Sequence, residues 1–422
     1  MENHMTYIFD DAIRYDDSPN LDAFGGLRTT SARIIGEYRT AYGVASALEY
    51  VSKIEGSGTR TTNYNKKQVE LVVTGNGDRV VHQTRQYHPY IAGTSNKFLI
   101  TFKMNTAKAN LQQMVGAFDD SNGIFFRMNG LTPEVVIRKG GVDNEIVART
   151  AWNKDRLDGS MNEYNQSGVT ADFSKCHILF IDYQWLGVGR VRIGFVIDGK
   201  PIVVHEFKHA NNTDEVYLFT PMLPVRWEIK STGATSSQMN AICAGVYCEG
   251  SEREVGFTCS VSTDGTVQTV SNTTVGQCLL AIRLKNSING LPVRALARLK
   301  EWALFSTNDA QYKVVIFNDA TKFSGTVNWV SVPGRSACEY AKAVTMAAGW
   351  MDDNNYSVLI DGFAQGAVGA GSGTNSLREI DNINNTISQN YDSSGSLILA
   401  IVAIKLSNNS DMKANLVWTE IR

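Results

Sequence analysis

The sequence predicts an all-β protein made of two β-sandwich domains of the jelly-roll kind, preceded by an extended N-terminal arm. Apolar and polar residues alternate over most of the chain, which is the period of strands with one buried face. Turn-forming Gly, Asn, Asp and Ser residues separate these segments, and no long apolar stripe of helical period competes with them. With 422 residues, the chain exceeds one ordinary hydrophobic core, so two domains are expected.

Changes in composition and hydrophobic periodicity along the chain predict the domain boundaries. Residues 1–74 are polar and weakly periodic, and are interpreted as an arm or irregular segment. Clear alternation follows, so a first sandwich is predicted at residues 75–248. The polar stretch 249–254 marks a boundary, and a second sandwich is predicted at residues 255–422, which are richer in Gly, Ser and Asn.

The centre of the first domain predicts a hairpin. Asp198-Gly199 is a strong two-residue turn signal, because both central positions of a type I′ turn need positive φ. The strand before it is Arg190–Ile197 and the strand after it is Lys200–Phe207. The nearly wholly apolar run Ile178–Tyr183 predicts a third, adjacent strand. A sheet with such an apolar face must be covered by a second sheet.

Other alternating segments predict the remaining strands. They lie at residues 98–104, 124–128, 225–229, 279–284, 312–317, 326–330, 356–360, 397–404 and 416–420. Residues 336–350 leave two alternatives open, a short helix or a strand. Ser336-Ala337-Cys338-Glu339 fits a capping box before an Ala-rich run, but that pattern is common by chance.

Composition excludes several classes of partner. The net charge is −2 and evenly spread, with no basic stripe or tail, so neither nucleic acid nor an anionic membrane is expected as a partner. No run approaches the ~20 apolar residues of a membrane helix, so no membrane insertion is expected. The N-terminus is polar and acidic, the opposite of a signal peptide. The six cysteines include no C-x-x-C pair and are expected to be free, buried thiols.

The segment His205-Glu206-Phe207-Lys208-His209 matches the zinc-protease pattern H-E-x-x-H. That chemistry needs a helix, on which positions four apart converge on one metal ion. Here the motif ends an extended segment, where residues four apart are separated by roughly 13 Å, at about 3.3 Å per residue. The match is therefore interpreted as part of a strand and its end, and no metal site is predicted.

Two glycine patterns resemble nucleotide-binding loops. Gly187-Val188-Gly189 lacks the third glycine of G-x-G-x-x-G, since Arg192 occupies that position, and no helix follows. It is interpreted as a turn. The glycine-rich run 366–373 lacks the Gly-Lys-Ser/Thr ending of a P-loop and is interpreted as a flexible loop, with contact at an interface as the alternative.

Acidic pairs raise two alternatives. Asp119-Asp120 and Asp352-Asp353 contain the carboxylates that a glycosidase needs, but neighbours on a strand point to opposite faces, so they are interpreted as solvated turn residues. Asp119, Asp120 and Asn122 are also candidate calcium ligands, although no D-x-D-x-D-G loop supports them.

Trp152 and Trp185 are candidates for stacking on sugars, with core packing as the preferred interpretation. The sequence thus predicts no catalytic, cofactor-binding or metal-binding residues.

Several segments, in order, resemble a family of tailed-phage virion proteins that is widespread in environmental phages. The most specific are Asp172–Lys175 and the long block Phe180–Lys200. Weaker matches lie at residues 23–28, 116–119, 123–126, 152–159 and 220–229, and at the 249–250 boundary. The resemblance covers roughly residues 20–285 well and the rest loosely.

The resemblance implies a first domain similar to concanavalin- or laminin-G-like sandwiches, and a strand at Cys338-Glu339-Tyr340. It implies a non-enzymatic structural component of a phage virion, such as a capsid decoration, vertex, neck or fibre-base protein, assembled in the host cytoplasm. The expected partners are other virion proteins and further copies of the chain, and no cofactor is expected. The alternative is a carbohydrate-binding adhesin of a head or tail fibre, which binds a host surface glycan through an exposed aromatic side chain beside Asp or Asn oxygens on loops.

Overall fold

The structure is a computed structural model. It describes residues 8–9, 12–13, 21, 32–41, 48–159, 161–249, 256–265, 267–318, 320–353, 355–366, 373–376, 386–390 and 394–422. Within these ranges the chain is all-β, which confirms the predicted fold class, and its helical segments are single turns, η1 (Arg149–Ala151) and η2 (Ala320–Lys322). No helix in the described ranges is long and apolar enough to span a membrane.

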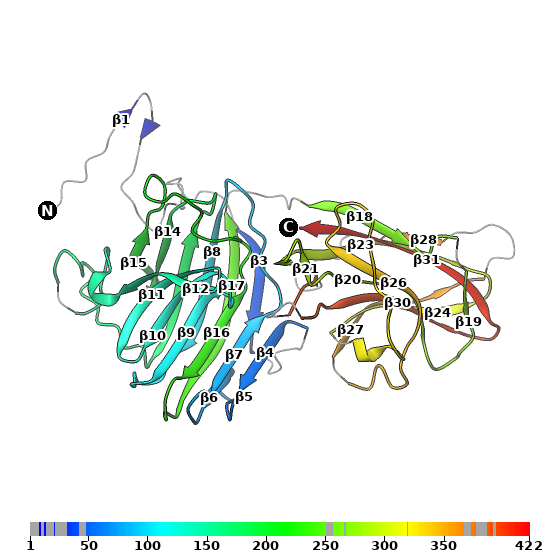
Figure 1. The fold of residues 1–422 in the computed structure, drawn as a ribbon, viewed down its shortest axis with the longest axis horizontal. Coiled ribbons are helices and arrows are strands. Elements are labelled where there is room, and N and C mark those ends of the chain that lie inside the picture. The colour runs from blue at the N-terminus through cyan, green and yellow to red at the C-terminus, as the bar shows by residue number, and fades with distance from the viewer. Residues whose placement is uncertain are drawn as a thin grey trace. The chain divides into compact units, whose positions relative to one another are not determined.

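The chain divides into two compact units (Figure 1). The first unit comprises Met1–Val44, Ser52–Gln83 and His88–Glu254, and the second comprises Ala45–Val51, Thr84–Tyr87 and Val255–Arg422.

The first unit contains two large antiparallel sheets. In order of pairing, sheet 1 consists of β12 (Val142–Ala148), β11 (Thr132–Lys139), β10 (Gly123–Asn129), β9 (Leu111–Phe118), β16 (Val225–Ser231), β7 (Arg79–Thr84) and β4 (Tyr50–Glu55). Sheet 2 consists of β15 (Lys200–Phe207), β14 (Val191–Ile197), β13 (Cys176–Tyr183), β8 (Ser95–Lys103), β17 (Ser237–Glu249), β6 (Gln68–Val73) and β5 (Thr59–Asn63), and β3 (Arg33–Arg39) also pairs with β17.

Aromatic side chains join the two sheets of the first unit. The Phe126 ring of sheet 1 meets the Phe102 and Phe195 rings of sheet 2, with centroids 6.1 and 5.2 Å apart. Trp227 of sheet 1 donates its indole N–H to the Thr101 carbonyl of sheet 2, over 3.2 Å. These residues face inward because alternate side chains of a strand share one face.

The predicted central hairpin is confirmed. β14 and β15 pair antiparallel, with Ile197 opposite Lys200, and the turn residues Asp198 and Gly199 have φ of 50° and 75°. Both turn residues therefore adopt the left-handed backbone that a type I′ turn requires. β13 pairs with β14, as the apolar run predicted.

The interpretation of residues 1–74 as an arm or irregular segment was wrong for its second part. β3, β4, β5 and β6 lie within it and belong to the two sheets. Alternation was weak there because β4 and β5 are edge strands, whose faces carry exposed polar residues. Residues 22–31, which include one motif of the family resemblance, lie outside the described ranges.

The second unit is also built on two antiparallel sheets. Sheet 3 consists of β18 (Phe257–Ser262), β31 (Ser410–Ile421), β23 (Leu296–Ser306) and β28 (Gly373–Ser376), with β19 (Gln268–Val270) on β31 and β29 (Thr386–Ile387) on β23. Sheet 4 consists of β25 (Val330–Ser331), β26 (Cys338–Thr345), β20 (Gln277–Leu284), β30 (Ile398–Lys405), β24 (Ala310–Phe317) and β27 (Tyr356–Ala364). Short hairpins pair β1 (Ile8–Phe9) with β2 (Ala12–Ile13), and β21 (Ser287–Ile288) with β22 (Leu291–Pro292).

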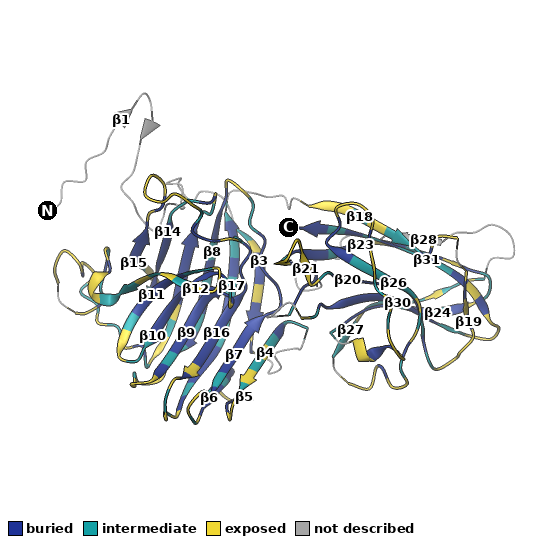
Figure 2. Cartoon of the chain, in the orientation of Figure 1, coloured by how far each residue is buried: buried dark blue, intermediate teal, exposed yellow. Residues whose placement is uncertain are grey.

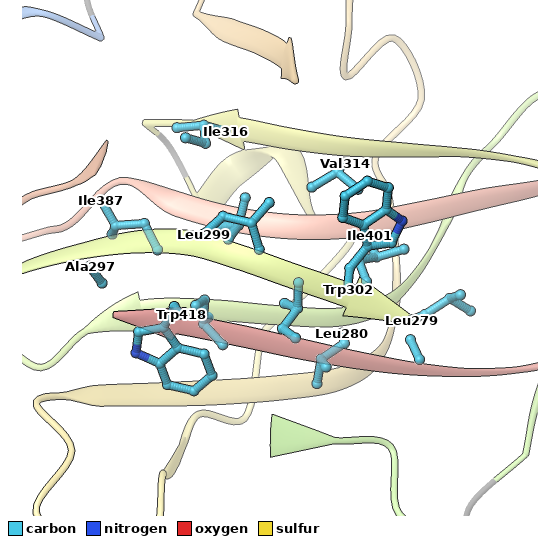
Figure 3. Close-up of a cluster of buried hydrophobic side chains, with 14 of the residues drawn as sticks. Leu279, Leu280, Ala297, Leu299, Trp302, Val314, Ile316, Ile387, Ile401 and Trp418 are labelled. Carbon is cyan, nitrogen blue, oxygen red and sulfur yellow. The ribbon is translucent and has the colours of Figure 1, made fainter. Parts of the chain in front are cut away.

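The core of the second unit contains large side chains from both of its sheets (Figure 3). Leu299 and Trp418 come from sheet 3, and Leu280, Val314 and Ile401 come from sheet 4. All five are buried, as the strand interiors are in both units (Figure 2).

Strand pairing in the second unit tests the predictions for residues 336–350 and 326–330. Residues 338–345 form the strand β26, so the strand alternative for 336–350 is confirmed over that range and the helix is excluded. The predicted strand at 326–330 was wrong except at its end, because only Val330–Ser331 pairs, with β26.

Candidate functional site

The H-E-x-x-H match lies in extended structure. His205 and Glu206 are in β15, and His209 follows the end of that strand. The prediction that the motif is not helical is confirmed. In the described ranges, no group of three or more His, Cys, Asp or Glu residues is arranged to hold a metal ion.

The polar atoms of this motif are engaged in local contacts. The Glu206 carboxylate is buried and lies 3.0 Å from Arg190 Nη1 and 3.3 Å from Lys154 Nζ. The His209 ring contacts the Gly189 carbonyl through Nδ1 at 2.7 Å and Glu145 through Nε2 at 3.0 Å. These contacts tie β15 to the loop before β14 and to β12, so the motif has a structural role.

The other sequence candidates are separated in the structure. Gly187 lies in a turn with φ of 81°, as predicted, and residues 367–372 of the glycine run lie outside the described ranges. Asp353 is half exposed and pairs with Lys322 at 2.6 Å. Trp152 is fully buried in the core, as preferred, whereas Trp185 is half-buried and donates its indole N–H to the Leu218 carbonyl.

The acidic loop between β9 and β10 does not offer a calcium site. Asp119 is buried, and its Oδ1 accepts the backbone N–H groups of Ser121 and Asn122, both at 2.7 Å. The Asn122 side-chain oxygen accepts the backbone N–H of Phe219 at 3.1 Å. These oxygens hold the loop itself, and only Asp120 extends into solvent, with 43% of its side chain exposed.

Three loops meet beside Asp120 and form what we call the loop site, made of Asp120, Ser121, Lys139, Gly140 and Phe219. The loop between β11 and β12 joins the acidic loop through a hydrogen bond from the Gly141 N–H to the Ser121 carbonyl, at 2.8 Å. The segment before β16 joins it through the Phe219–Asn122 hydrogen bond.

Phe219 is the exposed aromatic side chain of this loop site. It is 58% exposed, and the Lys139 ammonium lies 5.5 Å from its ring centroid. Gly140 lies against the ring, and a Cβ atom there would stand 2.8 Å from Phe219 Cε2. With φ of 61°, Gly140 also has a backbone that L side chains rarely adopt. The absence of a side chain at Gly140 therefore leaves room for the edge of the Phe219 ring beside the β11–β12 turn.

Two arginine side chains bind the Asp120 carboxylate. Its Oδ1 accepts hydrogen bonds from Arg79 Nη2 and Arg226 Nη1, both at 2.6 Å. Burial would raise the pKa of Asp120, but the two arginines outweigh burial and lower it well below its usual range. The carboxylate is therefore ionised at all ordinary pH values. Its other oxygen, Oδ2, has no partner in the part of the chain that the structure describes.

The outward face of sheet 1 continues from Asp120. The Phe118 and Phe125 rings stack there with centroids 4.4 Å apart, and the Arg226 and Arg138 guanidinium groups lie over them at 5.2 and 5.0 Å. The buried Glu228 accepts from Arg79 at 2.6 Å. Arg79 and Arg226 of this face also hold the Asp120 carboxylate, so the face supports the loop site.

The sequence did not predict this site. It interpreted Asp119 and Asp120 as solvated turn residues, with calcium ligation by Asp119, Asp120 and Asn122 as the alternative, and it gave no reason to single out Phe219. Asp119 is in fact buried. The Gly140-Gly141 pair after an alternating strand is a signal that could have indicated an unusual turn. Nothing in the sequence places that turn beside Phe219, which lies 79 positions further along the chain from Gly140.

Comparisons with known proteins give likenesses of fold only. No known protein family matches the sequence, and no curated protein matches it. Among solved structures, a protein of unknown function from Shewanella oneidensis is 8% identical, with 50% of this chain and 84% of that chain covered and a TM-score of 0.33.

Two further solved structures are similar over about half of this chain. A β-glucanase from Bacillus licheniformis is 10% identical, with 52% of this chain and 98% of that chain covered and a TM-score of 0.32. A legume lectin-like domain from Entamoeba histolytica is 12% identical, with 52% and 99% covered and a TM-score of 0.31. At these identities and TM-scores, the likenesses carry no conclusion about ligand or activity.

Proposed function

We propose that this chain is a non-enzymatic carbohydrate-binding protein and that the loop site binds the sugar. The observation that carries the proposal is an exposed aromatic ring, Phe219, beside an anchored carboxylate with an open oxygen, Asp120 Oδ2. Sugars present an apolar C–H face and a rim of hydroxyl donors. An aromatic ring offers apolar area against which the C–H face can pack. An ionised carboxylate can only accept hydrogen bonds, which suits the hydroxyl donors.

The positioning of both groups supports this reading. Arg79 and Arg226 hold Asp120 in one orientation, which reduces the entropy lost when a ligand hydroxyl binds. The backbone N–H of Phe219 donates to the Asn122 side-chain oxygen, which holds the segment in place, and the absence of a side chain at Gly140 leaves room for the ring. A pre-formed aromatic surface with a few fixed polar groups is typical of small-ligand sites.

A glycan array tests the proposal. We expect the full chain to bind a subset of glycans, and Phe219→Ala and Asp120→Ala to abolish that binding. Phe363→Ala, which removes a 68% exposed phenylalanine of β27 in the second unit, is the matched control and should bind as wild type does. Binding that persists in Phe219→Ala, or an array without hits at high protein concentration, would contradict the proposal.

We also propose that the chain is part of a tailed-phage particle. This rests on the family resemblance of the block Phe180–Lys200, which comprises the second half of β13, all of β14, their connection and the turn into β15. The two proposals are compatible, since a particle component can bind a host surface glycan. The test is to locate the chain in purified particles by density or by specific antibodies. Its absence from particles would refute this second proposal and leave the first untouched.

A further inference from the structure

The second unit has a pocket of about 420 Å³ along the edge strand β18. Phe257, Cys259 and Ser260 of β18 line one side of it, and Val332 and Arg335 line the other. The pocket therefore lies where β18, at the edge of sheet 3, faces the segment that follows β25, at the edge of sheet 4. We call the outer side of β18 together with this pocket the β18 edge.

β18 is an uncharged edge strand. It reads Phe-Thr-Cys-Ser-Val-Ser, is largely exposed (Figure 2), and pairs only with β31 within the described ranges. Other edges carry protection, such as Lys53 and Glu55 on β4, or Lys200 and Pro201 on β15. Charges and prolines at edges prevent pairing with other chains, and β18 has neither. Phe257 at its start is 64% exposed.

We propose that the β18 edge is an interface between two copies of this chain, with β18 of each copy pairing antiparallel across a two-fold axis at Ser260. A two-fold axis perpendicular to the sheet leaves the side chain of each residue on the same face of the sheet in both copies. Residues directly opposite each other in an antiparallel pair also share a face, so the axis must lie where one residue is opposite its own copy. Centring on Ser260 places Cys259 opposite Val261 of the second copy. Because the strand is uncharged, self-pairing brings no like charges together.

Charges at the two ends of β18 favour a second copy over an unrelated strand. Arg422, whose guanidinium group lies 5.5 Å from the Phe257 ring centroid, and the exposed Arg335 stand at the start of the strand. Asp264, with 68% of its side chain exposed, follows its end and pairs through Oδ2 with Lys342 at 2.6 Å, which leaves its exposed side open to further cations. Antiparallel self-pairing brings Asp264 of one copy opposite Gly256 of the other, beside these arginines. Opposite charges therefore meet at both ends of the interface.

Sedimentation velocity of the full chain tests the interface. We expect wild type to form a dimer and Ser260→Lys to be monomeric at the same concentration, because two lysines would face each other across the axis. Thr61→Lys, at another exposed position, on the edge strand β5 of the first unit, is the matched control and should remain dimeric. A monomeric wild-type chain, or a dimeric Ser260→Lys variant, would overturn the proposal.

Two further variants test the register. Ser260→Cys places one thiol opposite its own copy, so mild oxidation should give a covalent dimer, whereas wild type should stay non-covalent. Asp264→Lys should weaken dimerisation, and adding Arg335→Glu should restore it by exchanging the charges. If Ser260→Cys does not cross-link while the chain is dimeric, or if the charge exchange restores nothing, this register is wrong. Glycan binding plays no part in these measurements.

Discussion

At the scale of single residues, the buried histidine His88 shows how tertiary structure changes a side chain's chemistry. Its Nδ1 lies 2.8 Å from the Leu223 carbonyl and must donate to it, so Nε2 accepts from the Tyr38 hydroxyl at 3.0 Å. Burial lowers the pKa of His88 to about 4, although the Leu223 hydrogen bond opposes the shift. The ring is therefore neutral in the folded protein near pH 7.

This environment predicts a pH dependence of stability. The unfolded chain takes up the proton near pH 6.5, before the folded chain does, so the stabilisation is complete above pH 6.5 and is lost as pH falls toward 4. The loss approaches about 3 kcal/mol, at about 1.4 kcal/mol for each pH unit between the two pKa values. Urea unfolding at pH 7 and pH 4.5 should show a smaller difference for His88→Gln than for wild type. Equal differences would contradict the prediction.

At the scale of elements, Glu420 of β31, in sheet 3, connects that strand through hydrogen bonds to the segment before β26 of sheet 4. Its carboxylate accepts the Ala337 backbone N–H at 2.8 Å, the Trp418 indole N–H at 3.0 Å and the Ser336 hydroxyl, and it pairs with Arg422. Burial would raise the pKa of Glu420, but these donors outweigh it and lower the pKa to about 2.

Removing this carboxylate should destabilise the second unit. Glu420→Ala leaves four donors without an acceptor, so we expect a loss of about 3 kcal/mol in the free energy of unfolding. Glu301→Ala, an exposed position on β23, should change it by less than about 0.5 kcal/mol. Denaturant unfolding of the two variants measures the contrast. A Glu420→Ala variant as stable as Glu301→Ala would show that the carboxylate does not hold the sheets together.

At the scale of the whole molecule, each unit has its own interior, so we expect two unfolding transitions. His88 belongs to the first unit and Glu420 to the second. In calorimetry, His88→Gln should lower the midpoint of one transition and Glu420→Ala the midpoint of the other. If both variants shifted a single transition, the two units would be one cooperative body.

Much of the fold could be predicted because its signals are local. Alternation along Val191–Ile197 follows from the two-residue period of a strand, and Asp198-Gly199 specifies its turn by backbone sterics alone. Edge strands such as β4 and β5 escaped prediction, because neither of their faces is uniformly apolar. The choice between helix and strand at 338–345 was settled by pairing of β26 with β20, residues far away in the chain.

The sequence by itself determined the fold class, the central hairpin and the extended conformation that rules out the H-E-x-x-H zinc site, since each depends on neighbours in the chain. Only the tertiary structure decided which loops meet. Asp120 is anchored by Arg79 and Arg226, and Phe219 lies against Gly140. Strand pairing brings the three loops to one end of sheet 1 and sets Arg79 of β7 within reach of Asp120. A binding surface of this kind is set by long-range register, which no local pattern encodes.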